Sequence, residues 1–211
     1  MVSRVVRRGW IASFILVLMG ADPAHAQAGG LDLGNLDTRI SSGIYLPVGT
    51  YGDYYGFGPN VGLDVAYPLA DRVQMLLDLD LDLLKNDATY VPDGSAWRYR
   101  LGLQGRVVEG DGVLVTGHLG AGATTVRTDD LVFTEDPFRS ERIAGTRFTG
   151  TGGLRLGFEM DGGLAWWVGA DLNWSPAPEE DAQLLREVSP TDLEPLDSET
   201  TVGISLGLSL P

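Results

Sequence analysis

The sequence predicts an all-β protein in which eight antiparallel strands close into an up-and-down transmembrane β-barrel. Two observations carry this prediction. Apolar and polar residues alternate over eight separate stretches of the chain, which is the pattern of strands with one apolar and one polar face. The connections between these stretches alternate between long and short, as they do when strands run up and down across a membrane.

Two strands precede the middle of the chain, over residues 38–46 and 57–67. The first reads TRISSGIYL, so its isoleucines and leucine share one face. The second reads FGPNVGLDVAY, in which valine, leucine and tyrosine alternate with asparagine, glycine and aspartate. Both therefore have the period of a strand with two different faces.

The clearest hairpin joins strands 73–83 and 97–107. The intervening KNDATYVPDGSA is rich in turn-forming residues, which indicates that the two strands pair antiparallel. We expect Leu83 to lie opposite Trp97. This register predicts three facing pairs: Asp82 with Arg98, Asp80 with Arg100, and Gln74 with Arg106.

Three carboxylates, Asp78, Asp80 and Asp82, follow one another along one face of this hairpin. Such a row is compatible with a metal site or with a row of internal ion pairs. The ion pairs are favoured because the adjacent strand supplies the counter-charges.

Four further strands complete the set. They are 113–126 (VLVTGHLGAGATTV), 146–160 (TRFTGTGGLRLGFEM), 164–174 (LAWWVGADLNW) and 200–210 (TTVGISLGLSL). Each alternates large apolar residues with glycine, serine, threonine or charged residues. The predicted long loops are 47–56, 85–96, 127–145 and 175–199, and the short turns are 68–70, 109–112 and 161–163. Short turns of this kind are typical of the periplasmic side of such a barrel and long loops of the extracellular side.

The start of the chain has the features of a cleaved secretory signal peptide over residues 1–26. It has a charged segment with Arg4, Arg7 and Arg8, an apolar stretch over residues 10–19, and an A-x-A site that ends at Ala26. We therefore expect a signal peptide over 1–26, an N-terminal lead-in over 27–37 and a barrel domain over 38–211. The chain has no cysteine and a formal net charge of −14, which argues against nucleic acid as a partner.

The apolar face is predicted to point outward, toward lipid. The interior of an eight-stranded barrel is only just wide enough for side chains, so large apolar residues from every strand would overfill it. The polar face carries small residues and balanced charges, and charges in a closed interior require partners. The predicted lumen ion-pair network consists of Arg39, Asp64, Asp78, Asp80, Asp82, Arg98, Arg100, Arg106, Arg147, Arg155, Glu159 and Asp171.

Six aromatic residues on the apolar face lie near the strand ends. They predict two aromatic girdles at the membrane interfaces. The alternative is ordinary packing between strands. The girdle beside the short turns consists of Tyr67, Phe158 and Trp166, and the girdle beside the long loops consists of Trp97, Tyr99 and Trp174.

The alternation over residues 38–210, the loop rhythm and segments such as LPVGTYGDYYGFGPNVGLDVAYPL resemble the small eight-stranded outer-membrane β-barrel family of the OmpA/OmpX-like type. The resemblance implies the outer membrane of a Gram-negative envelope, contact with its lipid and lipopolysaccharide, and insertion by the barrel-assembly machinery. It implies no particular ligand. Such barrels usually end on an aromatic residue, whereas this chain ends Leu-Ser-Leu-Pro.

No sequence motif indicates catalysis, a metal or a cofactor. There is no Gly-x-Ser-x-Gly motif, no zinc-ligand spacing and no phosphate-binding loop. Outside the predicted signal peptide the sequence has a single histidine, His118. It is interpreted as a hydrogen-bonded lumen residue. We expect a non-enzymatic barrel with a structural or surface-interaction role. The alternatives are a narrow channel or small hydrophobic-ligand carrier and, second, a lipid-modifying barrel enzyme.

The long loops carry most of the unbalanced negative charge. They are interpreted as solvated, mobile segments, with bridging to lipopolysaccharide phosphates through divalent cations as the alternative. In the first loop, Tyr51, Tyr54, Tyr55 and Phe57 predict either an extension of the outer girdle or a patch that binds a partner.

Overall fold

The computed structural model describes residues 36–86, 92–110, 112–131, 133, 139, 141–160, 164–188 and 196–210. The predicted signal peptide over 1–26 and most of the predicted lead-in over 27–37 lie outside the described residues and stay predictions. No helix among the described residues is both long and apolar enough to cross a membrane.

All eight predicted strands are confirmed. They are β1 (Asp37–Val48), β3 (Gly58–Ala70), β4 (Val73–Asn86), β5 (Gly94–Gly110), β6 (Val113–Thr128), β7 (Ala144–Glu159), β8 (Ala165–Pro176) and β9 (Ser198–Leu210). The two-residue strand β2 (Tyr55–Gly56) adds a short pairing with the end of β4.

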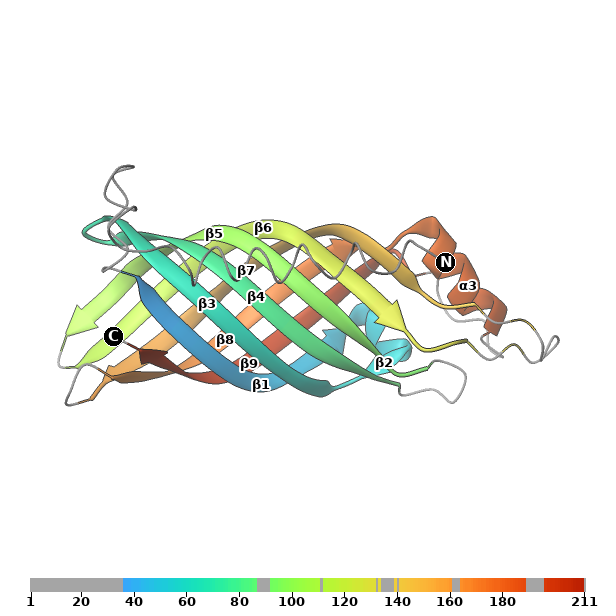
Figure 1. Ribbon diagram of the computed structural model, residues 1–211, viewed down its shortest axis with the longest axis horizontal. Coiled ribbons are helices and arrows are strands. Elements are labelled where there is room, and N and C mark those ends of the chain that lie inside the picture. The colour runs from blue at the N-terminus through green and yellow to red at the C-terminus, as the bar shows by residue number, and fades with distance from the viewer. Residues whose placement is uncertain are drawn as a thin grey trace, which may run out of the picture. The chain divides into compact units, whose positions relative to one another are not determined.

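The eight long strands form a closed ring. Each pairs antiparallel with its neighbours in the order β4-β3-β1-β9-β8-β7-β6-β5, and pairing of β4 with β5 closes the ring (Figure 1). Within this ring the first and last long strands of the chain, β1 and β9, also pair with each other, with Ile40 opposite Leu208. A closed ring leaves no strand with an unpaired edge, which is the condition for a sheet in a bilayer.

The register of the central hairpin differs from the predicted one by two residues. Trp97 lies opposite Leu81, Arg98 opposite Asp80, and Arg100 opposite Asp78, so the predicted facing pairs are wrong. A shift by two residues leaves every side chain on the face predicted for it, because the side-chain period of a strand is two. The alternation therefore determined the faces correctly and could not determine the register.

The predicted rhythm of short and long connections is confirmed. Short turns join β3 to β4, β5 to β6, and β7 to β8, and Gly112 has the positive φ of 75° that the second of these turns requires. At the opposite end, the long connections contain the 3-10 helix η3 (Gly49–Asp53) and the helix α3 (Glu179–Val188) (Figure 1). The helix corrects the expectation that residues 175–199 form a loop.

The two faces of the ring have the predicted orientation. Large apolar side chains cover the outside, with exposed fractions that reach 73% at Leu119 and 60% at Leu154. Charged and polar side chains are buried inside, and Asp82 is fully buried. This arrangement is the inverse of a soluble barrel and matches a barrel surrounded by lipid.

Candidate functional site: the barrel interior and its closed mouth

Arg100 is the centre of the lumen ion pairs. Its guanidinium group contacts the carboxylates of Asp78, at 2.6 Å, and Asp80, and it donates a hydrogen bond to Asn173. Because Asn173 belongs to β8 and the two aspartates to β4, this one side chain spans the interior of the barrel. Its side chain is 2% exposed, so its charge depends on these partners.

Arg98 and Arg155 extend the contacts in two directions. Arg98 pairs with Asp82 and donates to the Thr201 hydroxyl at 3.3 Å, which links β4, β5 and β9. Arg155 pairs with Asp64 at 2.6 Å and lies 3.8 Å from Asp78. These contacts join residues from β3, β4, β5, β7 and β9 in one buried cluster.

Two smaller groups lie on the side of the short turns. Arg39 pairs with Asp37 and donates to the Gln104 side chain at 2.7 Å. His118 lies 2.9 Å from Asp171 and is 4% exposed. His118 is thus a lumen residue, as its alternation on β6 indicated.

Besides Arg39 and Asp171, three further members of the predicted network do not join this cluster. Arg106 pairs at 3.4 Å with Glu109 on an exposed strand end, and Glu159 is exposed. Arg147 is buried near the opposite end and pairs with Asp181 and Glu199, two residues predicted to belong to a loop. Among the described residues, no group of three or more histidines and acids is arranged to hold a metal ion.

The side chains around the ion pairs fill most of the space between them. Trp167 points inward from β8, and the Arg155 guanidinium carbon lies 4.8 Å from its ring centre. The interior cavity lined by Asp80, Arg98, Arg155 and their neighbours has a volume of about 20 Å³. This is about the room that a single water molecule needs.

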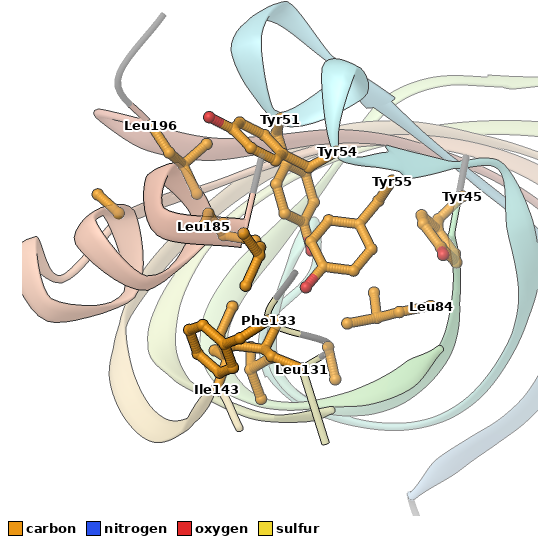
Figure 2. Close-up of a cluster of buried hydrophobic side chains, with 14 residues drawn as sticks. Tyr45, Tyr51, Tyr54, Tyr55, Leu84, Leu131, Phe133, Ile143, Leu185 and Leu196 are labelled. Atoms are coloured by element: carbon orange, nitrogen blue, oxygen red, sulfur yellow. The ribbon is translucent and has the colours of Figure 1, made fainter. Parts of the chain in front are cut away.

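The mouth on the side of the long loops is filled by apolar side chains. We call this set the mouth cluster, and Figure 2 shows its members packed against one another. The cluster joins the first loop, the segment before β7 and helix α3 across the end of the ring. Its members are Tyr45, Tyr51, Tyr54, Tyr55, Leu84, Ala96, Val126, Leu131, Phe133, Ile143, Ala182, Leu185, Val188 and Leu196.

Three tyrosines of the first loop belong to this cluster, which corrects the sequence interpretation. Tyr51, Tyr54 and Tyr55 are at most 2% exposed, whereas Phe57 is 69% exposed. The three tyrosines therefore neither extend an outer girdle nor form an exposed patch. Tyr45 supports them from β1, because its hydroxyl donates to the Leu83 carbonyl and accepts the Lys85 N–H.

Helix α3 is held at the mouth by charge as well as by apolar contact. Its residue Asp181 lies 3.0 Å from Arg147, and Arg147 also pairs with Glu199. On the outside, Arg139 contacts Glu187 of the helix at 2.7 Å and lies over the Phe133 ring. The mouth is closed by segments that three different hairpin connections supply.

Comparison with solved structures identifies the fold. The chain is similar to Neisserial surface protein A, with a TM-score of 0.55, 8% identity, and coverage of 83% of this chain and 96% of that one. It is also similar to a major outer membrane protein from Thermus thermophilus, with a TM-score of 0.51, 12% identity, and coverage of 82% and 98%. The fold is that of the small eight-stranded outer-membrane β-barrels. No family model and no curated protein matches the chain.

In this outer-membrane barrel fold, the six aromatic residues predicted to form girdles occupy outward positions near the strand ends. Phe158 lies opposite Trp166 beside a short turn, and their rings stack with centres 4.2 Å apart. Trp97 and Trp174 are 40% and 45% exposed toward the other end. Their role at the membrane interfaces stays a prediction.

The acids at the mouth predict a pH dependence for this part of the barrel. Asp181 and Glu199 lie beyond the level of Trp174, which is opposite Thr200. Burial is the main cause that raises the pKa of Asp181, and it raises the pKa of Glu199 from 4.5 to about 7. Since the folded state then holds the proton more tightly than an opened mouth, closure is strongest below pH 4.5 and weakens as the pH rises to about 7.

The measurement is amide hydrogen exchange of helix α3 over this pH range, corrected for the intrinsic exchange rate. We expect its protection to fall as the pH rises from 4.5 to 7. In Glu199→Gln, which cannot ionise, most of this fall should disappear. A profile that is flat in the wild type, or equally steep in the variant, would contradict the assignment to Glu199.

The sequence contained a signal for helix α3 that the loop interpretation overlooked. Pro178 precedes three acids, Glu179, Glu180 and Asp181, which is the pattern of a helix start. Ala182, Leu185 and Val188 then recur at helical spacing and are buried in the outer-membrane barrel's mouth. The three tyrosines gave no such signal, because a short Gly-rich loop has no periodicity.

Proposed function

We propose that this chain is an outer-membrane protein with a structural or surface-interaction role and without catalytic activity. The closed mouth is the observation that carries the proposal. It combines the apolar mouth cluster with the buried Arg147 ion pairs. A barrel closed in this way offers its outer surface, rather than its interior, to other molecules.

Placement in the outer membrane is supported by the apolar outside of the ring. Leucine, isoleucine, valine, phenylalanine and tryptophan side chains on successive strands are exposed there. Such a surface is stable in lipid and would aggregate in water. Membrane lipid and lipopolysaccharide are therefore its proposed neighbours, reached by export and by the barrel-assembly machinery.

The outward face of helix α3 is the proposed contact surface. Glu179, Glu180, Gln183 and Glu187 are exposed on it, while the opposite face is buried in the mouth cluster. Arg186 is also exposed there and Glu187 pairs with Arg139, so the negative charge that remains available comes mainly from Glu179 and Glu180. This charge suits a partner with positive charge.

The alternatives have less support. A narrow channel or small hydrophobic-ligand carrier needs a path through the interior, and the cavity beside Arg98 and Arg155 has a volume of only about 20 Å³. A lipid-modifying enzyme needs a catalytic group that meets lipid, and His118 points into the lumen, where it is 4% exposed.

The membrane placement is tested by gel mobility in SDS, with membrane-extracted protein left unheated or boiled. We expect a compact form that shifts on boiling. Leu119→Arg, in the middle of β6, should lower the free energy of unfolding in lipid vesicles by about 2–4 kcal/mol, because it puts a charge at the bilayer midplane. Val108→Arg, near the short-turn end of β5, is the matched control and should cost at most about 1 kcal/mol.

Two results would contradict the proposal. One is soluble periplasmic protein that shows no mobility shift and tolerates Leu119→Arg as well as Val108→Arg. The other is a steady ion conductance of the wild-type protein in planar bilayers, which would favour the channel.

A further inference from the structure

A polar hollow lies on the outside of the barrel at the long-loop end. It is formed where the ends of β5 and β6 meet the segment that precedes β7, and it has a volume of about 520 Å³. Its walls consist of Asp93, Gly94, Ser95, Arg127, Thr128, Asp129, Asp130 and Arg142.

Two arginines in this hollow differ from the other arginines at this end of the barrel. Arg139 and Arg147 have carboxylate partners, and Arg186 donates to the Ala182 carbonyl. Arg127 and Arg142 are exposed, and among the residues that the structure describes neither side chain makes a hydrogen bond or an ion pair. Two guanidinium groups thus share one hollow without an ion-pair partner among the described residues, although acids also line the hollow, in a chain whose formal net charge is −14.

The backbone beside both arginines is held in place. Val126 and Thr128, on either side of Arg127, are buried, so the strand alternation directs Arg127 outward. Next to Arg142, Ile143 is buried and exchanges two hydrogen bonds with Thr128, at 3.0 and 3.1 Å. Both arginines are therefore adjacent to buried residues whose backbone is hydrogen-bonded.

The hollow lies just beyond the predicted outer girdle. Thr125 is opposite Trp97, and Arg127 is the next outward-facing residue, about 7 Å farther along the strand. If the barrel spans the membrane as proposed above, this height is that of the outer-leaflet headgroups, and the inference rests on that placement. We propose that Arg127 and Arg142 bind a phosphate group of an outer-leaflet lipid headgroup.

The chemistry of the hollow fits a phosphate. A guanidinium group presents a planar pair of N–H donors that matches two phosphate oxygens. Of the three acids in the hollow, Asp93 is already engaged, since it accepts hydrogen bonds from the Lys85 ammonium at 2.7 Å and from the Asn86 N–H at 3.1 Å. Asp129 and Asp130 are exposed and oppose the binding of an anion. They should make the site weaker than two arginines alone would.

The test uses the full barrel, refolded in detergent micelles without divalent cations, and measures the affinity for lipid A by native mass spectrometry. Arg127→Gln/Arg142→Gln should weaken binding about tenfold or more for each arginine. Arg72→Gln is the matched control, because Arg72 is an exposed arginine in the short turn at the opposite end, and it should leave the affinity unchanged. Asp129→Asn/Asp130→Asn should strengthen binding.

Lipid A without its phosphate groups and inorganic phosphate are the two remaining probes. We expect the dephosphorylated lipid to bind the wild type as weakly as intact lipid A binds the double arginine variant. Inorganic phosphate should bind the wild type more weakly than lipid A does. Equal binding of the dephosphorylated lipid would overturn the proposal, as would equal losses in Arg72→Gln. Inorganic phosphate that binds as tightly as lipid A would overturn the assignment to a lipid headgroup.

The gel-mobility shift of each variant separates this inference from the proposed function. A wild type that shifts on boiling, together with unchanged lipid A affinity in the arginine variants, contradicts the headgroup site alone. A wild type that does not shift contradicts the membrane placement, and the headgroup site with it.

Discussion

Replacing Arg147 with leucine is expected to release helix α3 from the mouth while the ring of strands stays closed. Among the described residues, Arg147 is the only side chain that forms an ion pair with Asp181 and Glu199, and both acids are buried. Loss of one partner from a buried ion pair leaves an uncompensated charge, so we expect closure to weaken by roughly 3 kcal/mol near pH 8. The loss should be smaller at pH 5, where Glu199 carries its proton in the folded state.

Amide exchange of residues 179–188 and protease cleavage between β8 and β9 report this opening directly. Arg139→Leu is the matched control, because Arg139 also contacts helix α3, through Glu187, but its side chain is 35% exposed. An exposed pair contributes about 1 kcal/mol or less. Equal loosening by the two substitutions would show that burial of the Arg147 pairs is not what holds the helix.

Arg100→Leu is expected to destabilise the whole barrel. It leaves Asp78, Asp80 and Asn173 without the donor that joins them across the lumen. Removal of one partner from such a buried group costs about 3–5 kcal/mol. The denaturant concentration at which the compact gel form disappears should fall, and folding into vesicles should give a lower yield.

Arg106→Leu is the control on the same strand. Arg106 is 37% exposed and pairs only with Glu109 among the described residues, so its loss should change stability by about 1 kcal/mol or less. If Arg100→Leu were tolerated as well as Arg106→Leu, the lumen ion pairs would contribute little to folding, and the filled interior would depend on packing around Trp167 instead.

The sequence predicted the architecture because the decisive information is local. Alternation assigns each side chain to a face, and the rhythm of connections gives the topology without any knowledge of contacts. The register of the strands cannot be predicted in this way. The observed pairing of Asp78 with Arg100 and the predicted pairing of Asp80 with Arg100 leave the same side chains on each face. Only packing across the lumen distinguishes them.

The candidate site was harder to predict because its parts meet only in three dimensions. Arg147 was expected among the lumen pairs from its polar face, but its partners come from helix α3 and the first residues of β9. The mouth cluster includes Tyr51, Phe133 and Leu185, which belong to three separate connections. No periodicity relates such residues, so composition made these connections look like solvated loops.

The pairing of β1 with β9 has a consequence for the order of folding. These strands are the first and last of the ring, yet Ile44 lies opposite Ile204, so the final ladder joins segments separated by nearly the whole barrel sequence. Contacts of such long sequence separation form late, because the intervening chain must first be ordered. Two hydrogen-bonding edges must therefore stay unpaired until the last hairpin is in place, and during that interval the chain is most exposed to pairing with a neighbour.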